Sequence, residues 1–327
     1  MYELARLARG GVLLTVWALA AGWPRARLAA RLRGEGRQRI WRGAWAVPGK
    51  EVDRWVRAGA VQLLRPELVC SHRTAAALHR IELPAARRGG TGGPDGTEPL
   101  EFTGPGGGSA GGRIRVYGTA RLTDRDRGTR RGLRVTSPAR TVADLIRAAA
   151  TREEALVVAD SALSRRRVGG RCREPLLDRE ALAAALAVPR RPGGPRARRR
   201  LPPAEPGAGS PAETVARLRL RDAGLFPEVQ PVLRAPGGQA LRPDFLFRAE
   251  GLAVEIEGFA FHGTREAHER DVRRFNALGG CPGVRRVLRF TAREVFEHPD
   301  RMTAAVRAAL SSLGTPPRAG PRAAAAP

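Results

Sequence analysis

The sequence has almost no lysine and few cysteines, and each scarcity narrows the class of protein. Lys50 is the only lysine among 327 residues, so arginine supplies nearly all of the positive charge. The three cysteines, Cys70, Cys172 and Cys281, lie far apart, and no Cys-x-x-Cys pair occurs. This usage indicates neither a disulfide framework nor a structural zinc site, and it fits a reducing cytoplasm.

Long hydrophobic runs are also missing. The first apolar run, VLLTVWALAAGW, follows Arg6 and Arg9 and therefore has the pattern of a signal peptide. We interpret it instead as a buried helix that opens a small domain, because a regular pattern continues after it without a cleavage-like break. No later run reaches the roughly 20 apolar residues needed to span a bilayer. We therefore expect a cytoplasmic protein without a membrane partner.

Positive charge is what the chain has in excess. The formal net charge is +26, from 58 basic and 32 acidic residues. Such an excess favours a polyanionic partner, with nucleic acid as the first expectation. A GC-rich genome would explain the choice of arginine but not the excess of bases over acids. The length suffices for two or three domains.

Acids interrupt two short apolar runs between residues 242 and 290. Asp244 lies between Pro243 and Phe245, and Glu255 and Glu257 lie within LAVEIEG. Side chains alternate along a strand, so the two glutamates share one face. Neighbouring carboxylates on a half-buried strand repel each other and lose hydration. A divalent cation would relieve both costs, so this layout predicts a metal site.

An aspartate, ten further residues and then Glu-x-(acid or Lys) resembles the PD-(D/E)XK nuclease superfamily. VEIEGFAFH, residues 254–262, is similar to the signature of its bacterial very-short-patch-repair (Vsr)-like branch. The resemblance covers Ser210 to about Leu313 and implies a restriction-endonuclease-like α/β fold. Glu257 replaces the superfamily's lysine, and the zinc-binding cysteines of the mismatch-repair enzymes are absent.

This resemblance implies an Mg²⁺ (or Mn²⁺) site with Asp244 and Glu255 as ligands. Glu257 would be a further ligand or hold the attacking water, and His262 would be a general acid/base or a helix cap. Ser210 begins a capping box that includes Glu213. Glu213 is therefore expected either to cap the helix or to bind the metal, and the two roles have equal support. Gln230 would contact DNA or the ligands of the metal.

The helix expected after the motif carries further basic residues. Arg265, Arg270, Arg273 and Arg274 would line a track for phosphates. Val272, Phe275 and Leu278 would fill the core beneath it. The expected elements of this region are helices at 211–223, 264–278 and 299–313, strands at 229–234, 241–247, 252–257 and 284–290, and a helix that Thr291 and Glu294 begin as a capping box.

The N-terminal residues GVLLTVWALAAG, 11–22, resemble the winged-helix head of AbiEi-like type IV antitoxins. We expect helices in MYELARLARG, in VWALAAG with Thr15 as cap, and in PRARLAARLRGEG with Pro24 at its first position. In the last helix, Leu28 and Leu32 point inward. Exposed basic residues would then contact DNA in the major groove, or would form a solvated basic face. These residues are Arg25, Arg27 and Arg31.

Two further motifs, SHRTAAALH (71–79) and VTSPART (135–141), resemble elements of the same antitoxin-like group. We interpret Asp144 and Asp160 as structural acids without partners. The predicted organisation is a winged-helix domain at 1–50, an α+β antitoxin-like module at 51–188, an Arg/Pro-rich linker at 189–209, a Vsr-like nuclease domain at 210–313 and a disordered tail at 314–327.

The function expected from these residues is DNA binding with metal-dependent hydrolysis of DNA phosphodiester bonds. The alternative is an antitoxin-like transcriptional regulator with a catalytically silent nuclease fold and a cognate toxin as partner. RNA is a third expectation for the substrate.

Overall fold

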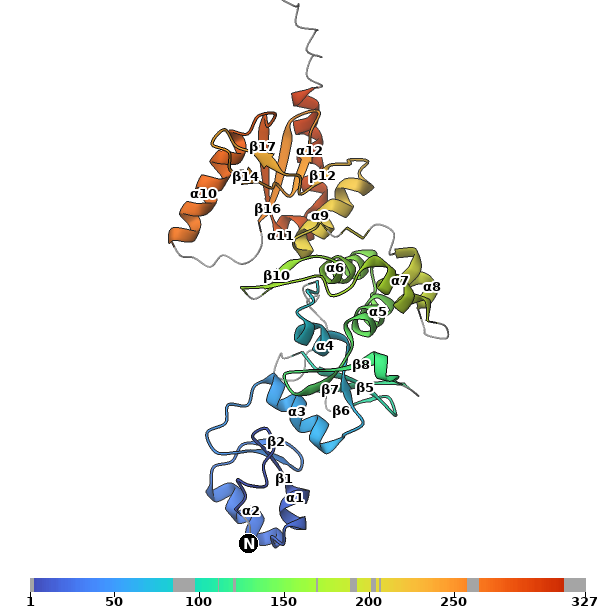
Figure 1. Cartoon of the computed structure of the whole chain (residues 1–327), viewed down its shortest axis with the longest axis vertical. Helices are drawn as coiled ribbons and strands as arrows, with labels where there is room; N and C mark the ends of the chain where they lie inside the picture. The colour runs from blue at the N-terminus through green and yellow to red at the C-terminus, as the bar shows by residue number, and fades with distance from the viewer. Residues whose placement is uncertain are drawn as a thin grey trace, which may run out of the picture. The chain divides into compact units, whose positions relative to one another are not determined.

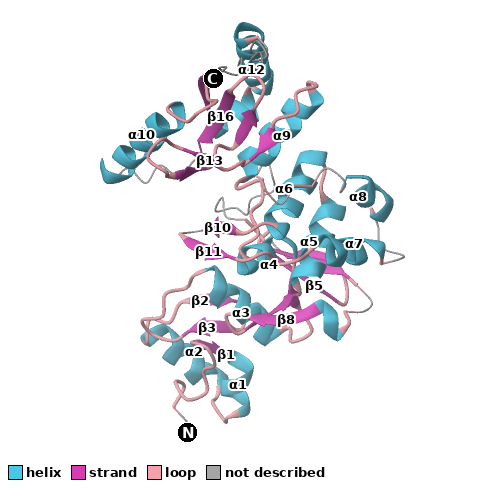
Figure 2. Cartoon of the chain, turned by 45° about the horizontal axis from the view of Figure 1, so that its top comes forward, coloured by secondary structure: helices cyan, strands magenta, loops and turns pink. Residues whose placement is uncertain are grey.

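The chain divides into two compact units, each with helices and sheets (Figures 1 and 2). One unit comprises residues 1–81 and 85–145, and the other comprises 82–84 and 146–327. The expectation of a mixed α/β protein is confirmed. The computed structural model describes residues 3–84, 98–110, 112–119, 122–168, 170–188, 193–200, 204–205, 207–257 and 265–314.

The first unit begins with a small helical and stranded domain. Its three-stranded sheet has the order β1-β3-β2, and Leu28 and Leu32 are buried beneath it as expected. Its elements are β1 (Val12–Leu14), α1 (Thr15–Ala20), α2 (Arg25–Gly34), β2 (Arg39–Trp41) and β3 (Ala44–Ala46).

Three details of this domain differ from the prediction. Residues 4–7 form turns rather than a first helix. Thr15 is the first residue of α1 rather than its cap, because Val12–Leu14 pairs with β3 as a strand and the helix starts directly after it. Pro24 occupies the N-cap of α2 in an extended conformation.

The remainder of the first unit is a six-stranded sheet of order β6-β7-β5-β4-β9-β8, with α3 and α4 packed on it. Asp53 begins α3 because its carboxylate accepts hydrogen bonds from the amides of Trp55 (2.9 Å) and Val56 (2.8 Å). The elements are α3 (Arg54–Leu64), β4 (Val69–Cys70), α4 (His72–His79), β5 (Leu100–Gly104), β6 (Gly108–Ala110), β7 (Ile114–Gly118), a 3₁₀ turn (Asp124–Asp126), β8 (Arg127–Arg130), β9 (Leu133–Thr136) and α5 (Pro138–Ala148), whose end belongs to the second unit.

The second unit starts with a helical layer and one hairpin. The segment expected to be a linker contains a helix, α8, which packs through the buried Ala197. Its arginines are structural: Arg196 and Arg200 donate to carbonyl oxygens at the end of α5 and just beyond it, which offsets the negative C-terminal end of that helix. The elements are α6 (Arg152–Leu163), β10 (Arg166–Val168), β11 (Arg171–Arg173), α7 (Arg179–Ala187) and α8 (Gly194–Arg200).

A four-stranded sheet of order β12-β15-β16-β17 forms the C-terminal half of this unit. β16 pairs antiparallel with β15 and parallel with β17. Helices α9 and α12 cover one face and α10 covers the other (Figure 1). The elements are α9 (Pro211–Asp222), β12 (Glu228–Val229), β13 (Leu233–Arg234), β14 (Ala240–Leu241), β15 (Phe245–Phe247), β16 (Leu252–Glu257), α10 (Arg265–Gly279), β17 (Arg286–Thr291), α11 (Ala292–Glu297) and α12 (Pro299–Leu313).

Helix α6 belongs with this sheet rather than with the preceding module, which explains the position of the boundary. Val157 packs in the same core as the sheet. Asp160 pairs with Arg217 of α9 at 2.8 Å, and both side chains are completely buried. Asp160 also accepts hydrogen bonds from Thr214 Oγ1 and the Glu205 amide. The expectation that Asp160 lacks partners is therefore wrong, because α6 and α9 lie against each other.

Within the part of the chain that the structure describes, no helix combines the length and the apolar character needed to cross a membrane.

Candidate active site

The acids of the motif meet where β15 begins beside β16. Asp244 immediately precedes β15, and Phe245 is paired with Val254, so Asp244 lies opposite Glu255. The Ile256 amide donates to Asp244 Oδ2 at 2.6 Å. Alternation along β16 buries Leu252, Val254 and Ile256 against α9 and α12. Glu255 is therefore directed to the face that α10 covers, as the sequence pattern predicts.

The connection between these strands needs a glycine. Gly251 has φ +71°, and a Cβ at this position would lie 2.5 Å from the carbonyl oxygen of Gly283. A side chain would therefore clash with backbone as well as adopt a conformation that favours glycine. This close approach sets the position of β16 beside β17.

Glu213 approaches the same place from the start of α9. Ser210 Oγ accepts from the Glu213 amide at 3.2 Å, which is the first half of the expected capping box. The Glu213 carboxylate reaches past the N-cap and accepts from the Gly209 amide (2.6 Å) and from Gln230 Nε2 (2.9 Å). Gln230 therefore helps to position the Glu213 carboxylate.

The pKa of Asp244 is raised by its surroundings. Burial is the main cause that raises the pKa of Asp244 to about 8, and the negative charges of Glu213 and Glu255 add to it. The Ile256 amide and the Arg274 guanidinium oppose the rise. At neutral pH and without a cation, Asp244 is therefore mostly protonated.

Glu255 has a cationic partner from the opposite side of the sheet. Arg274 of α10 donates to both of its carboxylate oxygens, from Nη1 to Oε2 and from Nη2 to Oε1 at 3.2 Å. The same Nη2 donates to the carbonyl oxygen of Arg242 at 2.7 Å. Burial raises the pKa of Glu255 even against this pairing. Arg274 thus binds the carboxylate of Glu255, whereas the sequence predicts that it binds phosphates.

Glu257 is paired in the same way by the neighbouring strand. Arg289 of β17 contacts its carboxylate at 2.6 Å. The Arg289 guanidinium also lies 5.0 Å from the ring centre of Phe275, which holds it over α10. Glu257 is therefore an acid neutralised by an arginine.

The donor chemistry of this cluster fits a hard divalent cation. Carboxylate oxygens are the ligands that Mg²⁺ prefers, and one or two of them suffice when water and phosphate complete the octahedron. Among the described residues, no three His, Cys, Asp or Glu side chains gather closely enough to hold a metal by themselves. Asp244 and Glu255 are therefore the pair to consider, with Glu213 at the edge.

The other predicted residues of this unit are less informative. His262 lies outside the described residues, as does the side chain of Arg265. Arg270 and Arg273 are exposed on α10, where a phosphate could reach them. Leu278 is buried as expected, whereas Val272, also expected in the core, is 43 % exposed.

The arginines predicted for DNA contact in the N-terminal domain are exposed along α2. Arg25 and Arg27 carry no ion pair among those that the described residues form. Arg31 differs, because its guanidinium lies 2.5 Å from Glu35, whose second oxygen accepts from Arg37. Arg25 and Arg27 are therefore the more available donors.

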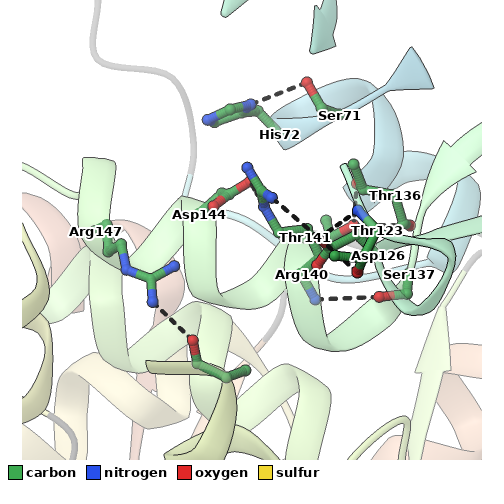
Figure 3. A network of polar contacts seen from close by, with 11 residues as sticks. Ser71, His72, Thr123, Asp126, Thr136, Ser137, Arg140, Thr141, Asp144 and Arg147 are labelled. Atoms are coloured by element: carbon green, nitrogen blue, oxygen red, sulfur yellow. Dashed lines mark hydrogen bonds and ion pairs between the residues drawn. The ribbon is translucent and has the colours of Figure 1, made fainter. Parts of the chain in front are cut away.

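The motifs at 71–79 and 135–141 meet where His79 Nε2 lies 2.7 Å from the carbonyl oxygen of Thr136, and Figure 3 shows polar residues around them. Arg140 pairs with Asp144 one turn later and with Asp126 at 3.6 Å. His72 bonds Ser71 Oγ through Nδ1 at 3.0 Å and stacks on Tyr117, with 3.6 Å between ring centres. Asp144 is thus structural as expected, but it does not lack partners.

The sequence matches no model of a known protein family, and no curated protein is significantly similar to it.

Sequence reasoning did not find the pairing of Arg274 with Glu255 or of Arg289 with Glu257. For Arg289 a signal was available, since a basic residue in a strand parallel to VEIE can face its acids. Arg274 has no comparable signal, because its contact depends on how α10 packs on the sheet.

Proposed function

We propose that the second unit contains a Vsr-like PD-(D/E)XK endonuclease domain that hydrolyses DNA phosphodiester bonds with Mg²⁺ or Mn²⁺. The supporting observation is the convergence of Asp244, Glu255 and Glu213 from two adjacent strands and a helix. Burial and the two neighbouring carboxylates disfavour the charged form of Asp244, and a bound cation would relieve this cost.

The roles of the residues follow from their contacts. Asp244 and Glu255 would hold the cation, and Gln230 orients Glu213 beside them. When bound, the divalent cation would supply Lewis-acid polarisation of the phosphate and a more acidic water. Glu257 would orient that water through its free lone pairs, and His262 would transfer a proton. Arg270 and Arg273 would bind the phosphates on either side of the cleaved bond.

The first unit would bring this domain to DNA. We propose that the AbiEi-like winged helix places α2 in the major groove, where Arg25, Arg27 and Arg31 contact phosphates or guanine edges. The excess of positive charge supports a polyanionic partner. The cytoplasm, where thiols stay reduced, is the compartment that fits three unpaired cysteines.

A second candidate is a DNA-binding regulator, with a cognate toxin as partner and a silent nuclease fold. One observation favours it: Glu255 and Glu257 each have an arginine partner. The acids could then be structural ion pairs rather than ligands.

A cleavage assay separates the two candidates. Purified full-length protein would be incubated with supercoiled plasmid, linear duplex, single-stranded DNA and RNA, each with Mg²⁺, Mn²⁺ or EDTA. We expect metal-dependent cleavage of DNA that Asp244→Ala and Glu255→Ala each abolish. The double variant should be no worse than either single variant, because residues that act as one unit are not additive.

Asp222→Asn is the matched control. Asp222 is an exposed acid of α9 that pairs with Arg152 at the surface, so its loss removes one negative charge without touching the site. If the wild type cuts no form of nucleic acid under any of these conditions yet still binds DNA, the regulator is the better description.

A further inference from the structure

Arg274 is held at the centre of the candidate site by three hydrogen bonds. Two go to the opposite oxygens of the Glu255 carboxylate, and the third goes to the carbonyl oxygen of Arg242. The Glu255 side chain is 11 % exposed, whereas that of Arg274 is 44 % exposed. The guanidinium thus binds a buried carboxylate, while part of the Arg274 side chain is open to solvent.

The site has no lysine, and Arg289, the other arginine beside these acids among the described residues, is already engaged. Arg289 binds Glu257 at 2.6 Å and is fixed over the ring of Phe275. A phosphodiester that enters beside Asp244 and Glu255 needs a positive charge to offset its own. Arg274 provides one at the required place.

We propose that Arg274 is the exchangeable cation of this site: it neutralises Glu255 in the free protein and binds the phosphate of the substrate once a divalent cation occupies Glu255. This inference rests on the proposed nuclease function and adds to it the group that replaces the missing lysine.

Competition for Glu255 follows from the contacts. Both carboxylate oxygens already accept from Arg274, so a divalent cation that coordinates either oxygen comes close to the guanidinium, and the two positive charges repel each other. The bond to the Arg242 carbonyl oxygen keeps the displaced guanidinium nearby. A planar guanidinium donates two parallel hydrogen bonds, a geometry that suits phosphate as well as carboxylate. Arg274 can therefore exchange one anion for the other without leaving the site.

The competition gives Arg274 two effects of opposite sign. Its removal should strengthen metal binding, because the cation no longer competes with a guanidinium for the Glu255 carboxylate. The same removal should slow cleavage, because the phosphate loses its donor. A residue that only stabilises the fold would not improve metal binding.

The test measures Mn²⁺ affinity by calorimetry and single-turnover DNA cleavage at saturating Mn²⁺ for the full-length wild type and Arg274→Ala. We expect about tenfold tighter Mn²⁺ binding, from the loss of a charge-assisted pair. We expect cleavage about 100-fold slower or worse, the usual effect of removing a donor to developing charge. Arg293→Ala, which removes an exposed arginine of α11 paired only with Glu297, should change neither quantity by more than about twofold.

Arg274→Gln is a second variant that distinguishes the loss of the positive charge from misfolding. Glutamine keeps a donor for the buried Glu255 but has no charge, so we expect the fold to survive, Mn²⁺ to bind more tightly than in the wild type, and cleavage to fall as in the alanine variant. A melting curve without metal checks that each variant is folded.

The outcomes separate this proposal from the nuclease function. Suppose that the wild type binds Mn²⁺ and cuts DNA, but that both Arg274 variants keep the wild-type Mn²⁺ affinity or the wild-type cleavage rate. The proposed exchange by Arg274 is then refuted, and the proposed nuclease function is retained. If only the Arg274 variants bind Mn²⁺, the arginine is shown to compete, but the wild type is no nuclease and the exchange fails with it. If no protein binds Mn²⁺, the proposed function fails first and the exchange has no basis.

Discussion

The carboxylate of Asp244 accepts a hydrogen bond from the backbone amide of Ile256 at 2.6 Å, next to Glu255 on the neighbouring strand. One acid is thereby tied to the strand that carries the other. The contact fixes the separation of the two carboxylates through backbone rather than through flexible side chains. Burial and the neighbouring carboxylates nevertheless disfavour the charged form of Asp244 at neutral pH, which gives the first prediction.

Asp244→Asn should stabilise the metal-free protein, and the gain should grow with pH. The pKa of Asp244 is raised to about 8 in the folded state, mainly by burial, whereas an unfolded aspartate titrates near 4. The folded protein therefore holds the proton more tightly, and stability falls as pH rises from about 4 to about 8. Asparagine, which stays neutral, avoids this loss.

Thermal melting in EDTA between pH 4 and pH 9 measures the effect. We expect little difference at pH 4 and up to about 5 kcal/mol in favour of Asp244→Asn at pH 8, because a pKa difference is worth about 1.4 kcal/mol per unit. Glu213 and Glu255 interact with the charge of Asp244, so the difference between the two proteins measures these three carboxyl groups together. A difference that does not change with pH would contradict the assigned pKa.

Gly251→Ala should disrupt the site through the backbone. The new Cβ would lie 2.5 Å from the Gly283 carbonyl oxygen, at a residue with φ +71°. We expect a loss of more than about 2 kcal/mol, from strain and collision together. Gly224→Ala is the matched control, because Gly224 has φ +77° but nothing within 4 Å of a Cβ, so only about 1 kcal/mol of strain is expected.

Chemical denaturation of the two glycine variants provides the comparison. Equal losses in both would show that the approach of Gly251 to Gly283 does not constrain the sheet.

The C-terminal unit could be predicted from sequence in some detail, and the reasons are local. LAVEIE alternates apolar and acidic residues, and it forms β16 with the faces expected. Thr291 and Glu294 form the expected capping box at the start of α11. Such patterns depend on neighbours within a few residues, so they can be read without knowledge of the fold.

Features that depend on docking could not be predicted in this way. The pair of Asp160 and Arg217 joins residues 57 positions apart, so nothing near Asp160 shows that it has a partner. The partner of Glu255 likewise comes from α10, whose register on the sheet is a tertiary property. The arginines of α8 lack apolar periodicity, so the sequence predicts a linker, yet the buried Ala197 and the bonds from Arg196 and Arg200 to carbonyl oxygens hold this short helix.

Breaking the pair of Asp160 and Arg217 should cost far more than breaking a surface pair. Both side chains are fully buried, and removal of one partner leaves the other charge without compensation. Arg217→Met should therefore lose about 3–5 kcal/mol. Arg152→Met, which breaks the exposed pair with Asp222, should lose less than about 1 kcal/mol.

Denaturant midpoints of the two methionine variants distinguish these cases. If Arg217→Met is as mild as Arg152→Met, the buried pair is not what joins α6 to α9.

DNA affinity should depend more on Arg27 than on Arg31. Glu35 already binds Arg31 at 2.5 Å, so this guanidinium must leave a partner before it can contact a phosphate, whereas Arg27 is exposed on the same helix. Arg27→Ala should weaken duplex binding and lower the slope of log affinity against log salt by about one. Glu35→Gln, which releases Arg31, should strengthen binding.

Fluorescence anisotropy with full-length protein in EDTA, over a range of salt concentrations, measures both effects without cleavage. Arg301→Ala, an exposed arginine of α12, provides the same change of charge in the other unit. An equal loss for Arg301→Ala and Arg27→Ala would indicate attraction by net charge rather than contact by α2.

The arginines of α8 that bind carbonyl oxygens also affect where a protease can cleave the folded chain. Trypsin cleaves after arginine, and a basic stretch without structure would be cut at every such residue. Arg196, Arg198 and Arg200 instead lie in a helix with their guanidinium groups on backbone oxygens of α5, of α7 and of the turn after α5. Recognition by the protease requires both an extended backbone and a free side chain, and these three residues offer neither. An abundance of potential cleavage sites in a sequence is therefore a poor guide to where a folded chain of this composition is nicked.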